Sequence, residues 1–193
     1  MGTWKRWGLG ILAVFVLAMP ARAQVQLFGI GATYGSVNDI SHTFNLSGFK
    51  PSEYTVFFDY HMDRSSLLRF TYGSMWTQQA LVGQTINGVF VPSAKEHVNY
   101  VTADASYLFG QDFYTGGIFG GIGGYQYNPE PMPAGFETYQ DPNKKYFGFN
   151  LGVDGTFRVM KHLEIVLRLT YHNISADPRR QFFNADAGLV ARF

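Results

Sequence analysis

The sequence contains no cysteine, which excludes a disulfide framework and any metal site built on thiolates. Neither sign of charge is in surplus, because 15 Lys and Arg residues stand against 14 Asp and Glu residues. A basic surface for nucleic acid is therefore not expected. Beyond residue 23 no apolar run approaches the roughly 18 residues of a transmembrane helix. The same region lacks charge-rich segments with the 3.6-residue helical period, so a mainly helical fold is excluded as well.

The first 23 residues have the three parts of an export signal. Lys5 and Arg6 are followed by an apolar stretch over residues 8–19, and Ala21 and Ala23 supply the small residues of a cleavage site. We expect residues 1–23 to be a cleaved signal peptide for the Sec pathway, with residues 24–193 forming a single domain. Cleavage would leave 12 basic and 14 acidic residues, a formal charge of −2.

Aromatic residues make up 17% of the chain and glycine contributes 22 residues. Apolar and polar residues alternate with the two-residue period of strands, most clearly at the end, where every second residue from Phe183 to Phe193 is apolar. The glycines of the fifth segment leave its register open. The sequence predicts an all-β protein with eight antiparallel strands, at about 25–35, 53–62, 68–76, 101–107, 113–125, 147–158, 163–172 and 183–193.

The connections between these segments alternate in length. Tight turns are expected near residues 63–65, 110–112 and 160–162, and long polar loops at 36–52, 78–95, 126–144 and 173–180. Short turns at one end and long loops at the other are typical of up-and-down outer-membrane barrels. Within the second loop, Asn87-Gly88 between apolar residues predicts a hairpin tip.

Two classes of eight-stranded barrel fit an exported chain: soluble lipocalin-like barrels with an apolar interior, and membrane barrels with an apolar exterior. The apolar faces carry aromatic residues near strand ends, which is typical of membrane interfaces. We therefore expect a transmembrane barrel with a polar interior, just wide enough for side chains to fill it. Buried charges need partners, so an ion-pair network is predicted among the inward-facing charges Glu53, Asp59, Arg69, Asp104, Asp154, Arg158, Glu164, Arg168, Asp186 and Arg192.

The signal, the eight strands, the loop rhythm and the terminal Phe together resemble the OmpA/OmpX-like family of small outer-membrane β-barrels. The OmpX-like form is the closer match, because no periplasmic domain is expected after the barrel. The resemblance implies a location in the outer membrane of a Gram-negative-type bacterium, amid membrane lipid and lipopolysaccharide. It further implies insertion by the barrel-assembly machinery, with Phe193 and the lipid-facing Ala187, Leu189 and Ala191 as the assembly signal. The long loops would then serve a structural role or contact an extracellular ligand.

Catalysis has one candidate cluster, formed by His172, Ser175 and Asp177 at the outer rim. Lipid A deacylases of the PagL type carry His and Ser two residues apart on one strand face. Here His172 and Ser175 are three apart and would face opposite sides, which favours a protein that is not an enzyme. The alternatives are a lipid A-modifying enzyme that uses these rim residues, or a narrow passive pore. The five histidines lack metal-ligand spacing, and no metal or cofactor is expected.

Overall fold

The computed structural model describes residues 27–41, 50–79, 85–92, 94–111, 113–140 and 142–193, so the expected signal peptide lies outside the described residues. Strands dominate these segments, and no described helix is long and apolar enough to cross a membrane. The elements are β1 Phe28–Asp39, β2 Lys50–His61, β3 Ser66–Gln78, β4 Thr85–Ile86, β5 Val89–Phe90, β6 Lys95–Gln111, β7 Tyr114–Pro129, the 3₁₀ helix η2 Glu137–Tyr139, β8 Lys145–Met160, β9 Leu163–Ile174 and β10 Arg180–Arg192.

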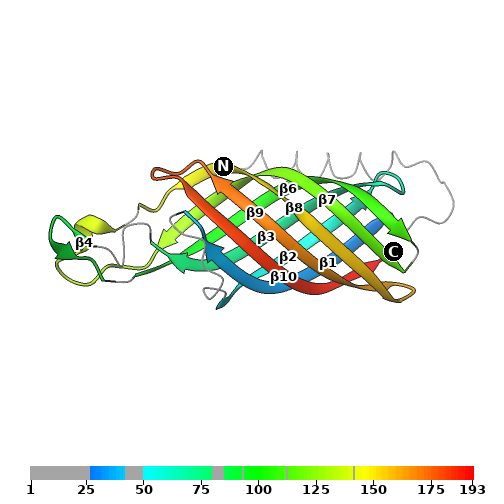
Figure 1. Cartoon of the computed structure of the whole chain (residues 1–193), viewed down its shortest axis with the longest axis horizontal. Helices are drawn as coiled ribbons and strands as arrows, with labels where there is room; N and C mark the ends of the chain where they lie inside the picture. Colours follow the sequence, from blue (N-terminus) through cyan, green and yellow to red (C-terminus); the bar gives the residue numbers. More distant parts are fainter. Residues whose placement is uncertain (1–26, 42–49, 80–84, 93, 112, 141) are drawn as a thin grey trace, which may run out of the picture.

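Eight of the strands form one closed antiparallel barrel in the order β1-β10-β9-β8-β7-β6-β3-β2 (Figure 1). Each barrel strand pairs with the barrel strand that follows it in the chain. The short β4–β5 hairpin is inserted between β3 and β6 and forms a separate two-stranded sheet. The wall closes where β1 pairs with β10, and two backbone hydrogen bonds of 3.0 and 3.1 Å join Phe28 to Phe193. The predicted all-β, eight-stranded barrel is therefore confirmed.

Several strands are longer than their sequence periodicity predicts, and the loops are correspondingly shorter. β3 and β6 stay paired up to Gln78 and Lys95, and β7 continues to Pro129. β9 and β10 likewise take up both ends of the expected loop at 173–180, which shrinks to residues 175–179. The pairing continues because the backbone groups of these segments satisfy one another and their inward side chains remain buried. Residues 42–49 of the first expected loop lie outside the described residues.

The barrel is apolar outside and polar inside. Large apolar side chains such as Ile30, Phe70 and Ile118 are about half exposed on the outer wall, whereas Arg69, Asp104 and other charged groups are buried within it. The register of the glycine-rich β7, which the sequence leaves open, directs Ile118 and Ile122 outward and Tyr125 inward. A soluble barrel would have the opposite distribution, so this wall is suited to lipid.

Candidate functional site

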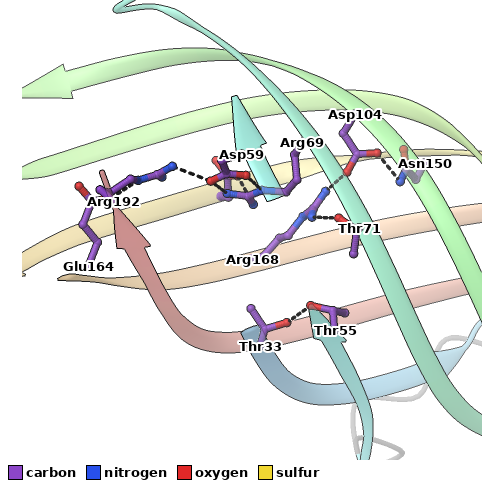
Figure 2. Close-up of polar contacts among 11 residues, drawn as sticks. Thr33, Thr55, Asp59, Arg69, Thr71, Asp104, Asn150, Glu164, Arg168 and Arg192 are labelled. Atoms are coloured by element: carbon purple, nitrogen blue, oxygen red, sulfur yellow. Dashed lines mark hydrogen bonds and ion pairs between the residues drawn. The ribbon is translucent and has the colours of Figure 1, made fainter. Parts of the chain in front are cut away.

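The barrel interior is crossed by a network of buried ion pairs (Figure 2). Arg69 on β3 donates from Nε and Nη2 to the Asp59 carboxylate on β2, at 2.6 and 2.9 Å, and from Nη1 to Asp154 Oδ2 on β8 at 3.1 Å. Arg192 on β10 donates to Asp59 Oδ2 at 2.7 Å and to Glu164 Oε2 on β9 at 3.1 Å. Because each ion is desolvated, these pairs hold the strands in one arrangement from the inside.

A second part of the network centres on Arg168 of β9. Its guanidinium is hydrogen-bonded to Asp104 on β6 and lies 4.0 Å from the centre of the Phe119 ring. Asn150 donates to the other oxygen of Asp104 at 2.8 Å (Figure 2). Arg158 lies elsewhere: its side chain is 47% exposed at one end of the barrel, 3.7 Å from Glu164. That residue is a rim cation, and it does not belong to the buried interior.

Near the opposite end, Arg180 forms an ion-pair cluster that the sequence analysis missed. Its guanidinium lies 2.8 Å from both Asp39 and Glu96 and donates to the carbonyl oxygen of Gln78 at 2.7 Å. Below it, side chains from six strands form an apolar core: Val37, Met75, Val98, Tyr100, Tyr125, Tyr127, Ile174 and Phe182. From the sequence, residue 180 is expected in a loop. The two-residue strand period that directs Phe182 and Asn184 inward also includes Arg180, and this period could have predicted its inward position.

The interior around His172 is closely filled. One internal cavity of about 10 Å³ lies among Thr, Arg168, His172 and Asp186 side chains, which is room for roughly a single water molecule. Asn150 Oδ1 and His172 Nε2 are buried here without a hydrogen-bond partner. Among the described residues, no group of His, Asp and Glu side chains has the arrangement of a metal site.

The three residues of the candidate catalytic cluster are not brought together. His172 is buried inside the barrel, where its Nδ1 lies 2.8 Å from the Tyr125 hydroxyl. Ser175 and Asp177 follow the end of β9 and are exposed. A different serine and histidine meet on the outer wall, where the Ser74 hydroxyl contacts His97 Nε2 beneath the Trp76 ring, whose centre is 4.3 Å from that of the imidazole. Ser74 is fully buried, so the hydroxyl is not open to a substrate.

Beyond the barrel wall, two connections pack together into what we call the surface arm, residues 85–92, 94 and 130–140. It contains the β4–β5 hairpin, whose tip residues Asn87 and Gly88 have φ of 51° and 81°. This confirms the expected hairpin. In Figure 1 the arm projects at the end of the barrel opposite the C-terminus.

The surface arm has an apolar core of its own. Val91, Ala94 and Met132 are buried and pack against Ile86, Phe136 and Tyr139. Gln79 fixes the base of the arm, because its Nε2 donates to the carbonyl oxygens of Lys95 and Glu130 at 3.2 and 2.7 Å. Near η2, the backbone N–H groups of Glu137 itself and of Gly135 lower the pKa of the Glu137 carboxyl. The segment at 130–140, expected only as part of a long polar loop, thus packs against the hairpin.

The residues of the expected assembly signal lie on the outer wall of β10. Phe193 is 57% exposed and its ring centre lies 6.4 Å from that of Phe28, while Leu189 is 52% exposed. Ala187 and Ala191 are exposed on the same face. This face therefore belongs to the apolar exterior.

No protein-family model and no curated protein sequence matches the chain. Solved structures do match. The match to Neisserial surface protein A has a TM-score of 0.56 and 11% sequence identity, and it spans 86% of this chain and 96% of that protein's chain. The N-terminal β-barrel domain of Pseudomonas aeruginosa OprF, with TM-score 0.56 and 12% identity, covers 86% and 97%. This chain has the fold of the OmpA/OmpX-like outer-membrane barrels. Ail of Yersinia pestis, solved with the heparin analogue sucrose octasulfate, matches with TM-score 0.50 and 11% identity over 86% and 96%.

Proposed function

We propose that this protein is an integral, non-enzymatic outer-membrane barrel that contacts other molecules at the cell surface through its surface arm. The apolar exterior and buried ion pairs support insertion in a membrane. The fold shared with bacterial outer-membrane barrels supports the outer membrane, where lipid and lipopolysaccharide would surround the wall. On this proposal, the barrel-assembly machinery inserts the chain, and the interior, which buried ion pairs cross, conducts no solute.

The observation that carries the surface role is the separate apolar core of the arm. A loop that only connects two strands needs no buried side chains, and surface loops are usually mobile and variable. Here Val91 has no exposed surface and Met132 is 7% exposed, although both lie outside the barrel wall. Burial of these side chains offsets the entropy cost of ordering the arm, so it can present a fixed surface to a partner.

The chemistry of that surface is set by the hairpin tip. Phe90 is 62% exposed and Val89 is 45% exposed, next to the polar Asn87-Gly88 turn. Exposed aromatic residues on ordered loops are frequent contact residues, because they bury much apolar area at low entropy cost. We therefore propose a macromolecular ligand with an apolar or aromatic contact patch. The heparin analogue bound by Ail supports a surface-contact role for barrels of this shape.

Cell-surface display tests this proposal. Cells that display the wild-type barrel, or the Val89→Ser/Phe90→Ser double variant, are applied to immobilised matrix protein, immobilised heparin and hydrophobic beads. We expect the wild type to be retained on at least one surface and the double variant to lose about tenfold in retention, since two apolar contacts are removed. Ser66→Ala, at the other end of the barrel, serves as the matched control. Retention of wild-type cells at the level of cells without the protein would contradict the proposal.

A further inference from the structure

Two acidic side chains meet inside the barrel across a glycine. Gly35 on β1 pairs with Glu53 of β2 on one side and with Asp186 of β10 on the other. A side chain on Gly35 would overlap Asp186 Oδ1 and the carbonyl oxygen of Ala185. Gly35 leaves this space open, and the buried side chains of Glu53 and Asp186 flank it from the two neighbouring strands. Both side chains are buried: Glu53 is 1% and Asp186 is 8% exposed.

This pair differs from the other carboxylates of the network, each of which has an arginine partner. Asp59 and Asp154 pair with Arg69, and Asp104 pairs with Arg168. Among the described residues, neither Glu53 nor Asp186 forms an ion pair within 4 Å. Glu53 Oε1 accepts hydrogen bonds from the Tyr100 hydroxyl and from Asn184 Nδ2, the latter at 2.8 Å.

The remaining oxygens indicate what the pair lacks. Glu53 Oε2 and Asp186 Oδ1 are buried with no hydrogen-bond donor. Two ionised carboxylates side by side within a barrel would repel each other and lose their hydration as well. One proton between them removes a charge and supplies the donor that both oxygens need. We propose that Glu53 and Asp186 form an internal proton-binding site, in which a Glu53 carboxylic acid donates to the Asp186 carboxylate in the folded barrel.

The groups that face the pair are consistent with this assignment. Arg168 on β9 lies opposite Asp186 in the sheet, although its guanidinium is bonded to Asp104. Tyr100 on β6 donates to Glu53, and the Tyr100 ring centre lies 5.2 Å from that of His172. His172 in turn contacts Tyr125 of β7. The proton therefore belongs on Glu53, the member of the pair further from the cation.

The site makes folding depend on pH with a definite sign. In the unfolded chain both carboxyls ionise near pH 4, so at neutral pH the folded barrel holds one more proton than the unfolded chain. The free energy of unfolding therefore falls as the pH rises above about 4. While the folded barrel retains the proton, the unfolding equilibrium constant increases by up to about tenfold per pH unit.

Urea unfolding of the barrel in detergent micelles, at pH values from about 5 to 9, tests the site. We expect the wild type to show this slope and Glu53→Gln to lose it, because the amide donates to Asp186 without titrating. Glu164→Gln is the matched control: it removes a buried carboxylate that already has Arg192 as a partner, and it should keep the slope. Equal slopes for the wild type and Glu53→Gln would overturn the proposal.

Three further measurements do not depend on how Glu53→Gln folds. Asp186→Asn removes the same shared proton and should also flatten the slope. In the wild type, infrared spectroscopy at neutral pH should show the carbonyl band of a protonated carboxyl, and its absence would overturn the site. Replacing sodium by a bulky organic cation at constant ionic strength should leave stability unchanged. A loss of stability would mean that a metal cation, and not a proton, lies between the carboxyls.

Discussion

Two requirements restrict which residue can occupy a position inside this barrel. Some positions need a charged side chain that pairs with a partner, and others need a glycine because neighbouring groups fill the space of a side chain. Arg69 satisfies carboxylates on β2 and β8 at once, and its guanidinium lies 4.2 Å from the centre of the Phe57 ring. Gly35 contributes through its missing side chain, which allows two carboxyls to meet above it. The second kind of constraint is harder to see in a sequence, because glycine also occurs where nothing restricts it.

Two glycine substitutions separate these cases. Gly35→Ala should destabilise the barrel by about 1–3 kcal/mol, because the new methyl group overlaps Asp186 and backbone atoms. Gly124→Ala is the matched control on the outer face of β7, where an added Cβ meets no atom within 4 Å, and its effect should stay within about 0.5 kcal/mol. Urea unfolding in micelles measures both. Equal losses for the two variants would show that the space above Gly35 is not limiting.

At the scale of elements, the sequence was informative where one face meets lipid and the other is polar. The alternation from Phe183 to Phe193 predicted β10 and its faces correctly. It failed beyond the membrane, where Met75, Val98 and Tyr127 point inward and make the interior apolar, so the two-sided pattern that marks a strand fades. Partners such as Arg180 and Glu96 are far apart in the chain, and only the register of the closed sheet brings them together.

The surface arm should unfold without the barrel if its core is removed. Val91→Asp places a charge at a position with no exposed surface, so the arm should lose its fixed structure and be cleaved by protease while the barrel stays intact. Val89→Asp is the matched control, because Val89 is 45% exposed. Limited proteolysis followed by mass spectrometry locates the cuts. Equal resistance of the two variants would contradict a separate core in the arm.

At the scale of the whole molecule, charged side chains lie inside the barrel and apolar side chains lie outside, which is the reverse of a soluble barrel. The wall closes at the seam where β1 pairs with β10. Phe28 and Phe193 meet at one end of this seam, on the lipid-facing side. The ring of Phe193 contributes little to a wall whose backbone bonds are already made. Its larger contribution is expected during insertion, before the seam exists.

Phe193→Ser should therefore reduce the amount of barrel assembled in the outer membrane several-fold, while the free energy of unfolding in micelles changes by less than about 1 kcal/mol. Phe113→Ser is the matched control, since Phe113 is 68% exposed in the turn between β6 and β7. Cell fractionation gives the first quantity and urea unfolding the second. If both quantities fall in proportion, the side chain acts through packing alone.

The seam also sets the order of events in time. Every other pair in the wall joins two barrel strands that follow one another in the amino-acid sequence. β1 and β10, in contrast, come from opposite ends of the described chain. Until β10 has arrived, β1 presents a row of unpaired backbone groups that lipid cannot satisfy. The strands can therefore pair one after another, but the barrel closes only when β10 pairs with β1. We therefore expect the open edge of β1 to need protection from lipid until β10 pairs with it.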